Sequence, residues 1–304
     1  MLGRQLVLYR RAGRDNKRLK AMYQQDITRK HRTAIVVAID QSSSMSLLFG
    51  HGATRQSKAD LVARITNELI SELLLRSRYD GGVRDYYDIA VVGYSDNKVY
   101  SLLGDHLDFK PVSSLDKRDV DTKMVVERCV MLDGREVSVY REYPEWVKAR
   151  ACGSTPMYQM LCKVSDMLER WCAQPCNRDS FPPILVNISD GVPDGITENL
   201  LSISRHIKSL GTNDGTVLFV NVHISSSEDT SSLVMPNMSE IDIANREAML
   251  FARMSSVLPV SMERGAEAIR CTFANSPYIA MGYNTSPVEL NSMLRIGTRS
   301  VGVE

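Results

Sequence analysis

Five oxygen-bearing side chains stand in three short stretches that could together bind a hard metal ion. Asp40, Ser42 and Ser44 alternate along the chain directly after an apolar run at 34–39. Thr155 lies in a Gly-Ser-Thr-Pro stretch, and Asp190 lies in an Ile-Ser-Asp-Gly stretch. Carboxylate and hydroxyl oxygens are the ligands that cations such as Mg²⁺ prefer. The alternative interpretation of the first stretch is that its Ser and Asp residues only cap the next helix.

The elements expected around these stretches bring them to one edge of a sheet. Apolar, β-branched runs at 33–40 and 183–189 predict strands that are buried on both faces. Strands alternate with amphipathic helices along the chain, which predicts an α/β fold: a doubly wound, mostly parallel sheet flanked by helices. Parallel strands end at the same edge of a sheet, so Asp40 and Asp190 should meet there. The other expected strands are 86–94, 99–103 and 216–223, and the expected helices are 57–78, 157–172, 196–210, 244–258 and 262–270.

Charge and regularity divide the 304 residues into three parts. Residues 1–32 form a basic N-terminal arm with ten Lys or Arg against two Asp, a formal charge of +8. Residues 33–258 form the α/β domain, with a charged insertion at about 104–148, and 259–304 form a C-terminal extension that packs on it. A basic arm can bind nucleic acid, a membrane surface or an acidic protein face, or it can dock on its own acidic body.

Several classes of protein are not expected from the sequence. No secretory signal or apolar run of membrane-spanning length is visible, and the six cysteines are scattered, so we expect reduced thiols and a cytoplasmic protein without a membrane partner. There is no nucleophile elbow and no glycine-rich phosphate loop. A phosphotransferase with Asp40 as nucleophile would want a second acid where Ser42 stands. We therefore expect no enzyme activity.

The pattern resembles the metal-ion-dependent adhesion site (MIDAS) of the von Willebrand factor A (VWA) domain family. That motif reads Asp-x-Ser-x-Ser, then a Thr in a second loop and an Asp in a third, and Asp40, Ser42, Ser44, Thr155 and Asp190 match it in order. The resemblance covers about residues 33–258 and implies a Rossmann-like fold. Two departures are Ser43, where many members have Gly, and the long separation of Asp40 from Thr155, which the insertion explains.

The resemblance also implies how such a site works. Ser42, Ser44 and Thr155 would bind Mg²⁺ directly, whereas Asp40 and Asp190 would act largely through waters or hydrogen bonds; Mn²⁺ or Ca²⁺ could take the same ligands. An open coordination position would then accept an Asp or Glu carboxylate of a protein partner. The residues expected at the partner-binding rim are Gln41, Ser43, Ser154 and Asp194.

The chain is most similar to stand-alone bacterial VWA proteins of the tellurite-resistance and stress-signalling type. That resemblance implies an adaptor whose partner is a Ser/Thr kinase, a metal-dependent Ser/Thr phosphatase or a chaperone-like ATPase. The alternative from another class is a nucleic-acid-associated adaptor that uses the basic arm. A third reading is a structural α/β domain whose metal site is vestigial.

Overall fold

A computed structural model describes residues 22–49, 56–116, 120–130, 136–191, 194, 196–224, 232–270 and 277–295. Most of the basic arm, at 1–21, therefore lies outside the described residues. Residues 22–32 lie against the body of the protein, where Tyr23 and Ile27 are buried. No helix in the described ranges combines the length and the apolar character that crossing a membrane requires.

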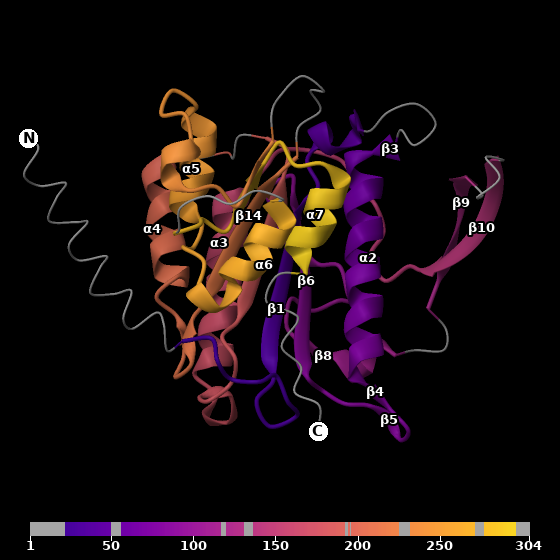
Figure 1. Ribbon diagram of the computed structural model, residues 1–304, viewed down its shortest axis with the longest axis horizontal. Coiled ribbons are helices and arrows are strands. Elements are labelled where there is room, and N and C mark those ends of the chain that lie inside the picture. The colour runs from indigo at the N-terminus through magenta and orange to yellow at the C-terminus, as the bar shows by residue number, and fades with distance from the viewer. Residues whose placement is uncertain are drawn as a thin grey trace, which may run out of the picture.

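The centre of the fold is an eight-stranded mixed sheet (Figure 1). Its order is β15-β16-β14-β11-β1-β6-β7, and β8 also pairs with β6. The neighbours from β6 to β16 are parallel, while β7, β8 and β15 pair antiparallel at the two sides. This confirms the predicted doubly wound, mostly parallel sheet. The strands are β1 (Thr33–Asp40), β6 (Tyr87–Ser95), β7 (Lys98–Ser101), β8 (Lys110–Pro111), β11 (Ile184–Ser189), β14 (Leu218–His223), β15 (Leu233–Val234) and β16 (Met281–Tyr283).

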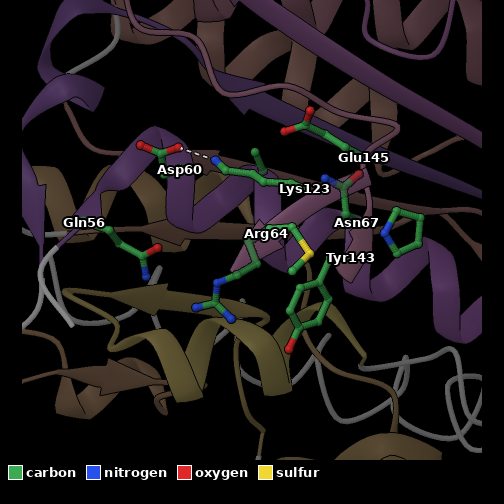
Figure 2. A pocket seen from close by; sticks show the side chains of 10 residues that line it. Gln56, Asp60, Arg64, Asn67, Lys123, Tyr143 and Glu145 are labelled. Atoms are coloured by element: carbon green, nitrogen blue, oxygen red, sulfur yellow. Dashed lines mark hydrogen bonds and ion pairs between the residues drawn. The ribbon is translucent and has the colours of Figure 1, made fainter. Parts of the chain in front are cut away.

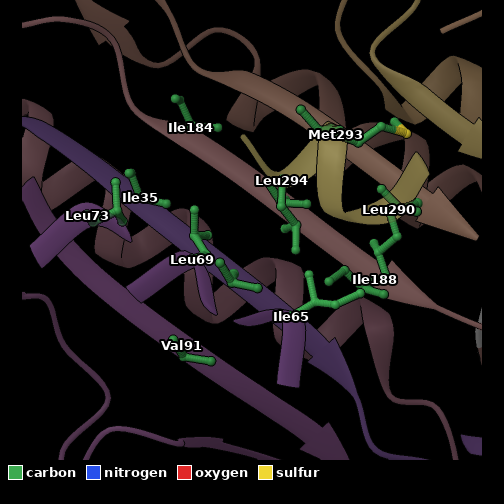
Figure 3. Close-up of a cluster of buried hydrophobic side chains, with 14 of the residues drawn as sticks. Ile35, Ile65, Leu69, Leu73, Val91, Ile184, Ile188, Leu290, Met293 and Leu294 are labelled. Atoms are coloured by element: carbon green, nitrogen blue, oxygen red, sulfur yellow. The ribbon is translucent and has the colours of Figure 1, made fainter. Parts of the chain in front are cut away.

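Helices cover both faces of the sheet because its central strands are apolar on both sides. In β1, Ile35, Val37 and Ile39 belong to the core on one face, and Val36 and Ala38 belong to the core on the other. The first core is completed by α2, α6 and α7, as Figure 3 shows in part, and the second by α3, α4 and α5. The helices are α2 (Lys58–Ser77), α3 (Met157–Cys172), α4 (Thr197–Ile207), α5 (Arg246–Met254), α6 (Val260–Arg270) and α7 (Pro287–Leu294).

The charged insertion contains a β-hairpin. Strands β9 (Thr122–Val130) and β10 (Glu136–Pro144) pair antiparallel over nine residue pairs. In Figure 1 this hairpin projects from the body on the far side of α2 from the sheet. The remaining strands form three two-stranded pairs: β2 (Leu48–Phe49) with β3 (Gln56–Ser57), β4 (Arg78–Tyr79) with β5 (Gly82–Val83), and β12 (Gly211–Thr212) with β13 (Gly215–Thr216).

The C-terminal region requires a correction to the expected domain boundary at residue 258. Strand β16 pairs parallel with β14 inside the central sheet, and Leu290, Met293 and Leu294 of α7 are buried in the core beside α2. Residues beyond 258 therefore complete the sheet and the core rather than only packing on a finished domain. The strand has three residues, which is too short to give a periodic signal in the sequence.

Candidate metal centre

The fold brings the three ligand-bearing loops to one edge of the sheet. Asp40 is the last residue of β1, and Asp190 follows directly after the last residue of β11. These two strands are parallel neighbours, with Ile39 opposite Ile188. Thr155 lies two residues before α3, which packs over the same sheet. The position outside the carboxyl ends of parallel strands is where ligands bind in open α/β sheets.

A chain of short hydrogen bonds joins the first and third loops. Ser42 Oγ lies 3.0 Å from Ser44 Oγ, and Ser44 Oγ donates to Asp190 Oδ1 at 2.6 Å. The short helix η1 (Ser43–Ser46) turns the chain after β1 and places both hydroxyls on this side. Two hydroxyl oxygens and a carboxylate thus converge from segments 146 residues apart.

Asp40 lies beneath this chain, fully buried at the end of β1. The Ser42 backbone N–H donates to its Oδ1 at 2.8 Å, and the Ser189 hydroxyl donates to its Oδ2 at 2.6 Å. Burial nevertheless dominates and raises the pKa of Asp40 from 3.8 to about 6, with the neighbouring charge of Asp190 acting in the same direction. The charge of Asp190 therefore adds to the effect of burial in disfavouring ionisation of Asp40.

Backbone contacts tie the Thr155 loop to the other two. The Ser43 N–H donates to the Gly153 carbonyl at 3.0 Å, and the Thr155 N–H donates to Asp194 Oδ2 at 2.9 Å. Gly153 has a φ of +77°, and a Cβ there would stand 2.6 Å from the Cβ of Asp96, so this sharp turn requires glycine. Thr155 itself is buried, and its backbone carbonyl accepts from the Asp194 N–H at 3.1 Å.

The four residues expected at the rim differ in their exposure to solvent. Ser43, Ser154 and Asp194 are exposed around the site. Gln41 is only 2% exposed, so it lies behind the rim instead of on it. Its side-chain oxygen accepts from the Tyr100 hydroxyl at 2.6 Å, which holds it against the sheet and away from solvent. The expectation that Gln41 faces a partner is therefore wrong.

Two further residues at the site escaped the sequence analysis. Ser189 orients Asp40, and Lys58, the first residue of α2, donates from Nζ to Asp190 Oδ2 at 2.7 Å. The Lys58 side chain is 2% exposed and the Asp190 side chain is fully buried. The local sequence shows only a lysine at the start of the expected helix 57–78, and the partner of this lysine is distant in the sequence.

The donor set suits a hard divalent cation. Three hydroxyls and two carboxylates offer only oxygen, which is the chemistry of Mg²⁺, Mn²⁺ and Ca²⁺ sites. Within the described ranges no group of three or more His, Cys, Asp and Glu side chains could hold a metal ion, so a cysteine- or histidine-rich site is not formed there. Ser42, Ser44 and Thr155 would hold the ion, with Asp40 and Asp190 behind them.

A separate hollow lies between α2 and the projecting hairpin (Figure 2). It encloses about 300 Å³ and is lined by polar and charged side chains together with Met124, Tyr143 and Pro144. Lys123 of β9 donates to Asp60 of α2 across it at 3.0 Å, and both side chains are about half exposed. This contact helps to attach the insertion to the helix that carries Lys58.

Comparisons with known proteins add similarities at the level of structure. No protein-family model and no curated protein matches the sequence. The VWA domain of SpRpn10 is 13% identical, with a TM-score of 0.35 over 65% of this chain and 77% of that one. The vWF domain of the type V pili tip protein Mfa5 from Porphyromonas gingivalis is 16% identical, with a TM-score of 0.29 over 54% and 39%.

A third similar structure is an uncharacterized membrane spanning protein from Vibrio fischeri, 12% identical, with a TM-score of 0.28 over 67% of this chain and 74% of that one. Within this chain, the strand order and the meeting of the Asp40 and Asp190 loops at one sheet edge agree with the fold that the motif resemblance implied. The protein has a Rossmann-like α/β fold.

Proposed function

We propose that this protein is a metal-dependent protein-binding module that uses a MIDAS-type Mg²⁺ site to capture an acidic residue of a partner. The observation that carries the proposal is the hydrogen-bonded chain from Ser42 through Ser44 to Asp190, at the edge where the Thr155 loop also ends. Neutral hydroxyl ligands leave a bound divalent ion electron-poor, so it retains affinity for an added carboxylate.

The surroundings of the site support recognition of a protein surface. Ser43, Ser154 and Asp194 are exposed around it, so a partner side chain has access from solvent. Leu47 and Leu48, which follow η1, are each about half exposed and offer apolar contact beside the rim. By resemblance, we place this activity in a cytoplasmic stress-response or signalling system of the tellurite-resistance type. A Ser/Thr kinase, a metal-dependent phosphatase or a chaperone-like ATPase would then supply the acid.

The test is a Mg²⁺ titration by calorimetry, with thermal unfolding followed in parallel. Wild type should bind one Mg²⁺ and become more stable, because a ligand that binds only the folded state raises the unfolding temperature. Ser42→Ala should weaken binding by about tenfold or more, as losses at metal sites typically do. The matched control is Ser46→Ala in the same loop: this exposed serine donates to the Ser43 carbonyl and lies outside the ligand set.

Equal Mg²⁺ binding by wild type and Ser42→Ala, or no binding by wild type, would reject the proposal. If the metal does bind, the partner step is tested with the purified candidate partners, with Mg²⁺ and with EDTA. Complexes that form equally well in EDTA would show that the metal is not the contact.

A further inference from the structure

The buried ammonium group of Lys58 is a feature of this edge that a cation site does not need. Its Nζ lies 2.7 Å from Asp190 Oδ2, and the two side chains are 2% and 0% exposed. Burying an ion pair removes both charges from water, which is expensive unless the geometry and the other hydrogen bonds are good. A lysine paired with Asp190 in this way changes the affinity of Asp190 for any other cation.

The backbone holds Lys58 firmly in this position. Ser57 caps α2 by accepting from the Asp60 N–H at 3.0 Å, and the Lys58 N–H donates to the Leu47 carbonyl at 3.1 Å. Leu47 directly follows η1, the short helix that carries Ser44. The start of α2 and the metal loop are therefore joined by a main-chain bond as well as by the ion pair.

The two oxygens of Asp190 have different partners. Oδ1 accepts from Ser44, one of the expected ligands, whereas Oδ2 accepts from Lys58. The positive charge of Lys58 thus lies across a single carboxylate from the hydroxyls that would hold the metal. Two positive charges at that separation repel each other strongly in a site screened from water.

The burial of Lys58 also excludes a simpler role. A partner's carboxylate cannot pair with an ammonium group that is 2% exposed, so lysine does not replace the metal as the contact for the partner. Its influence has to pass through Asp190. Lys58 is therefore a positioning residue, because it contacts the Asp190 carboxylate behind the expected ligands and not the metal or the partner.

We propose that Lys58 is an internal counter-ion that sets the cation affinity of the site. It balances Asp190 when no metal is bound, which keeps the three loops assembled, and it opposes a divalent ion when one enters. Metal binding is thereby made weaker and more easily reversed than the ligand set alone would give. This inference rests on the proposed metal-dependent function and adds a regulator to the same site.

The experiment compares Mg²⁺ binding by wild type, Lys58→Met and a control, using calorimetry at pH 7.5. Methionine keeps much of the length of lysine without the charge. Lys58→Met should bind Mg²⁺ about tenfold more tightly or better, because a repelling charge near the ion has been removed. The control is Lys123→Gln, which removes a lysine paired with Asp60 in the same helix turn, but on the exposed side, and should change the affinity by less than about twofold.

A gain in the Mg²⁺ affinity of Lys58→Met distinguishes the counter-ion role from a purely structural one. If Lys58 only maintained structure, its loss would loosen the loops and weaken metal binding. Removing it leaves a buried, unbalanced carboxylate, which should destabilise the metal-free variant. Mg²⁺ should therefore raise the unfolding temperature of Lys58→Met by more than that of wild type. If the variant does not fold in EDTA, Mg²⁺-induced folding followed by circular dichroism gives the same comparison.

The outcomes separate this inference from the proposed function. If wild type binds Mg²⁺ and Lys58→Met binds it equally or less well, the counter-ion role is overturned and the metal-binding function stands. If neither protein binds Mg²⁺, the proposed function fails and the inference falls with it. If only Lys58→Met binds, the lysine opposes the ion so strongly that the role is supported while metal-dependent function of the wild type is rejected.

Discussion

Replacing Asp40 by asparagine should stabilise the metal-free protein at neutral pH. Asp40 is fully buried, and burial raises the pKa of its carboxyl group from 3.8 to about 6. An amide fits the same place, because the Ser42 N–H can donate to its oxygen. The Ser189 hydroxyl can then accept from the new amide and turn its own proton toward the Gly191 carbonyl, 3.4 Å away.

The magnitude and sign of this stability change follow from the pKa of Asp40 in the folded and in the unfolded chain. At about 1.4 kcal/mol for each unit of pKa, the rise from 3.8 to about 6 corresponds to about 3 kcal/mol. Below pH 4 both the folded and the unfolded chain carry a proton on Asp40, so this group costs nothing. Between pH 4 and 6 the unfolded chain loses its proton first, and the free energy of unfolding falls. Above pH 6 the full penalty is present.

This penalty can be measured by urea unfolding of wild type and Asp40→Asn in EDTA, from pH 4 to pH 7. The two proteins share every other titrating group, so the difference between their free energies of unfolding gives the penalty of the Asp40 charge. The variant should exceed wild type by only about 0.5 kcal/mol at pH 4 and by about 3 kcal/mol at pH 7. Excess Mg²⁺ should raise the stability of wild type and not that of the variant. A difference that does not change with pH, or a less stable variant at pH 7, would refute the assigned burial of the charge.

Two other perturbations test the neighbourhood of the site. Tyr94→Phe removes the hydroxyl that donates to buried Asn187 Oδ1 at 2.8 Å, so the free energy of unfolding should fall by about 1–3 kcal/mol in urea, and unchanged stability would contradict this contact. The Arg150 guanidinium lowers the pKa of the Cys152 thiol, whereas burial raises the pKa of Cys172 to about 11. Iodoacetamide at pH 8 should thus label Cys152 before Cys172 in peptide mapping, and the reverse order would count against these environments.

The positions of the loops that carry the expected ligands could be predicted from sequence because their signals are local. An apolar run that stops abruptly at Asp40 marks the end of a buried strand, and the same holds for the run before Asp190. Pro156 directly after Thr155 marks the start of a helix. Parallel pairing then brings these ends together without any knowledge of side-chain contacts.

The residues that escaped prediction depend on contacts between distant segments. Lys58 meets Asp190 across 132 residues of sequence, and Ser189 meets Asp40 across 149. A lysine at the start of an amphipathic helix normally faces solvent, so nothing local indicates that it is buried. Gln41, which we expect at the rim from the sequence, accepts a hydrogen bond from Tyr100 on β7 and is buried against the sheet.

The two acids of the candidate centre lie in different electrostatic environments, and this difference constrains how a cation could enter. Asp190 is balanced by Lys58, which is fixed in the structure by the start of α2. Asp40 has no cationic partner among its hydrogen bonds, and burial shifts it toward its protonated form. A divalent ion at the hydroxyls would therefore displace the proton of Asp40 more readily than the ammonium of Lys58. Metal affinity would then decrease as the pH falls below about 6, because Asp40 takes up a proton. In the proposed site, the strand-end carboxylate would thus make metal binding depend on pH, and the helix lysine would limit the affinity.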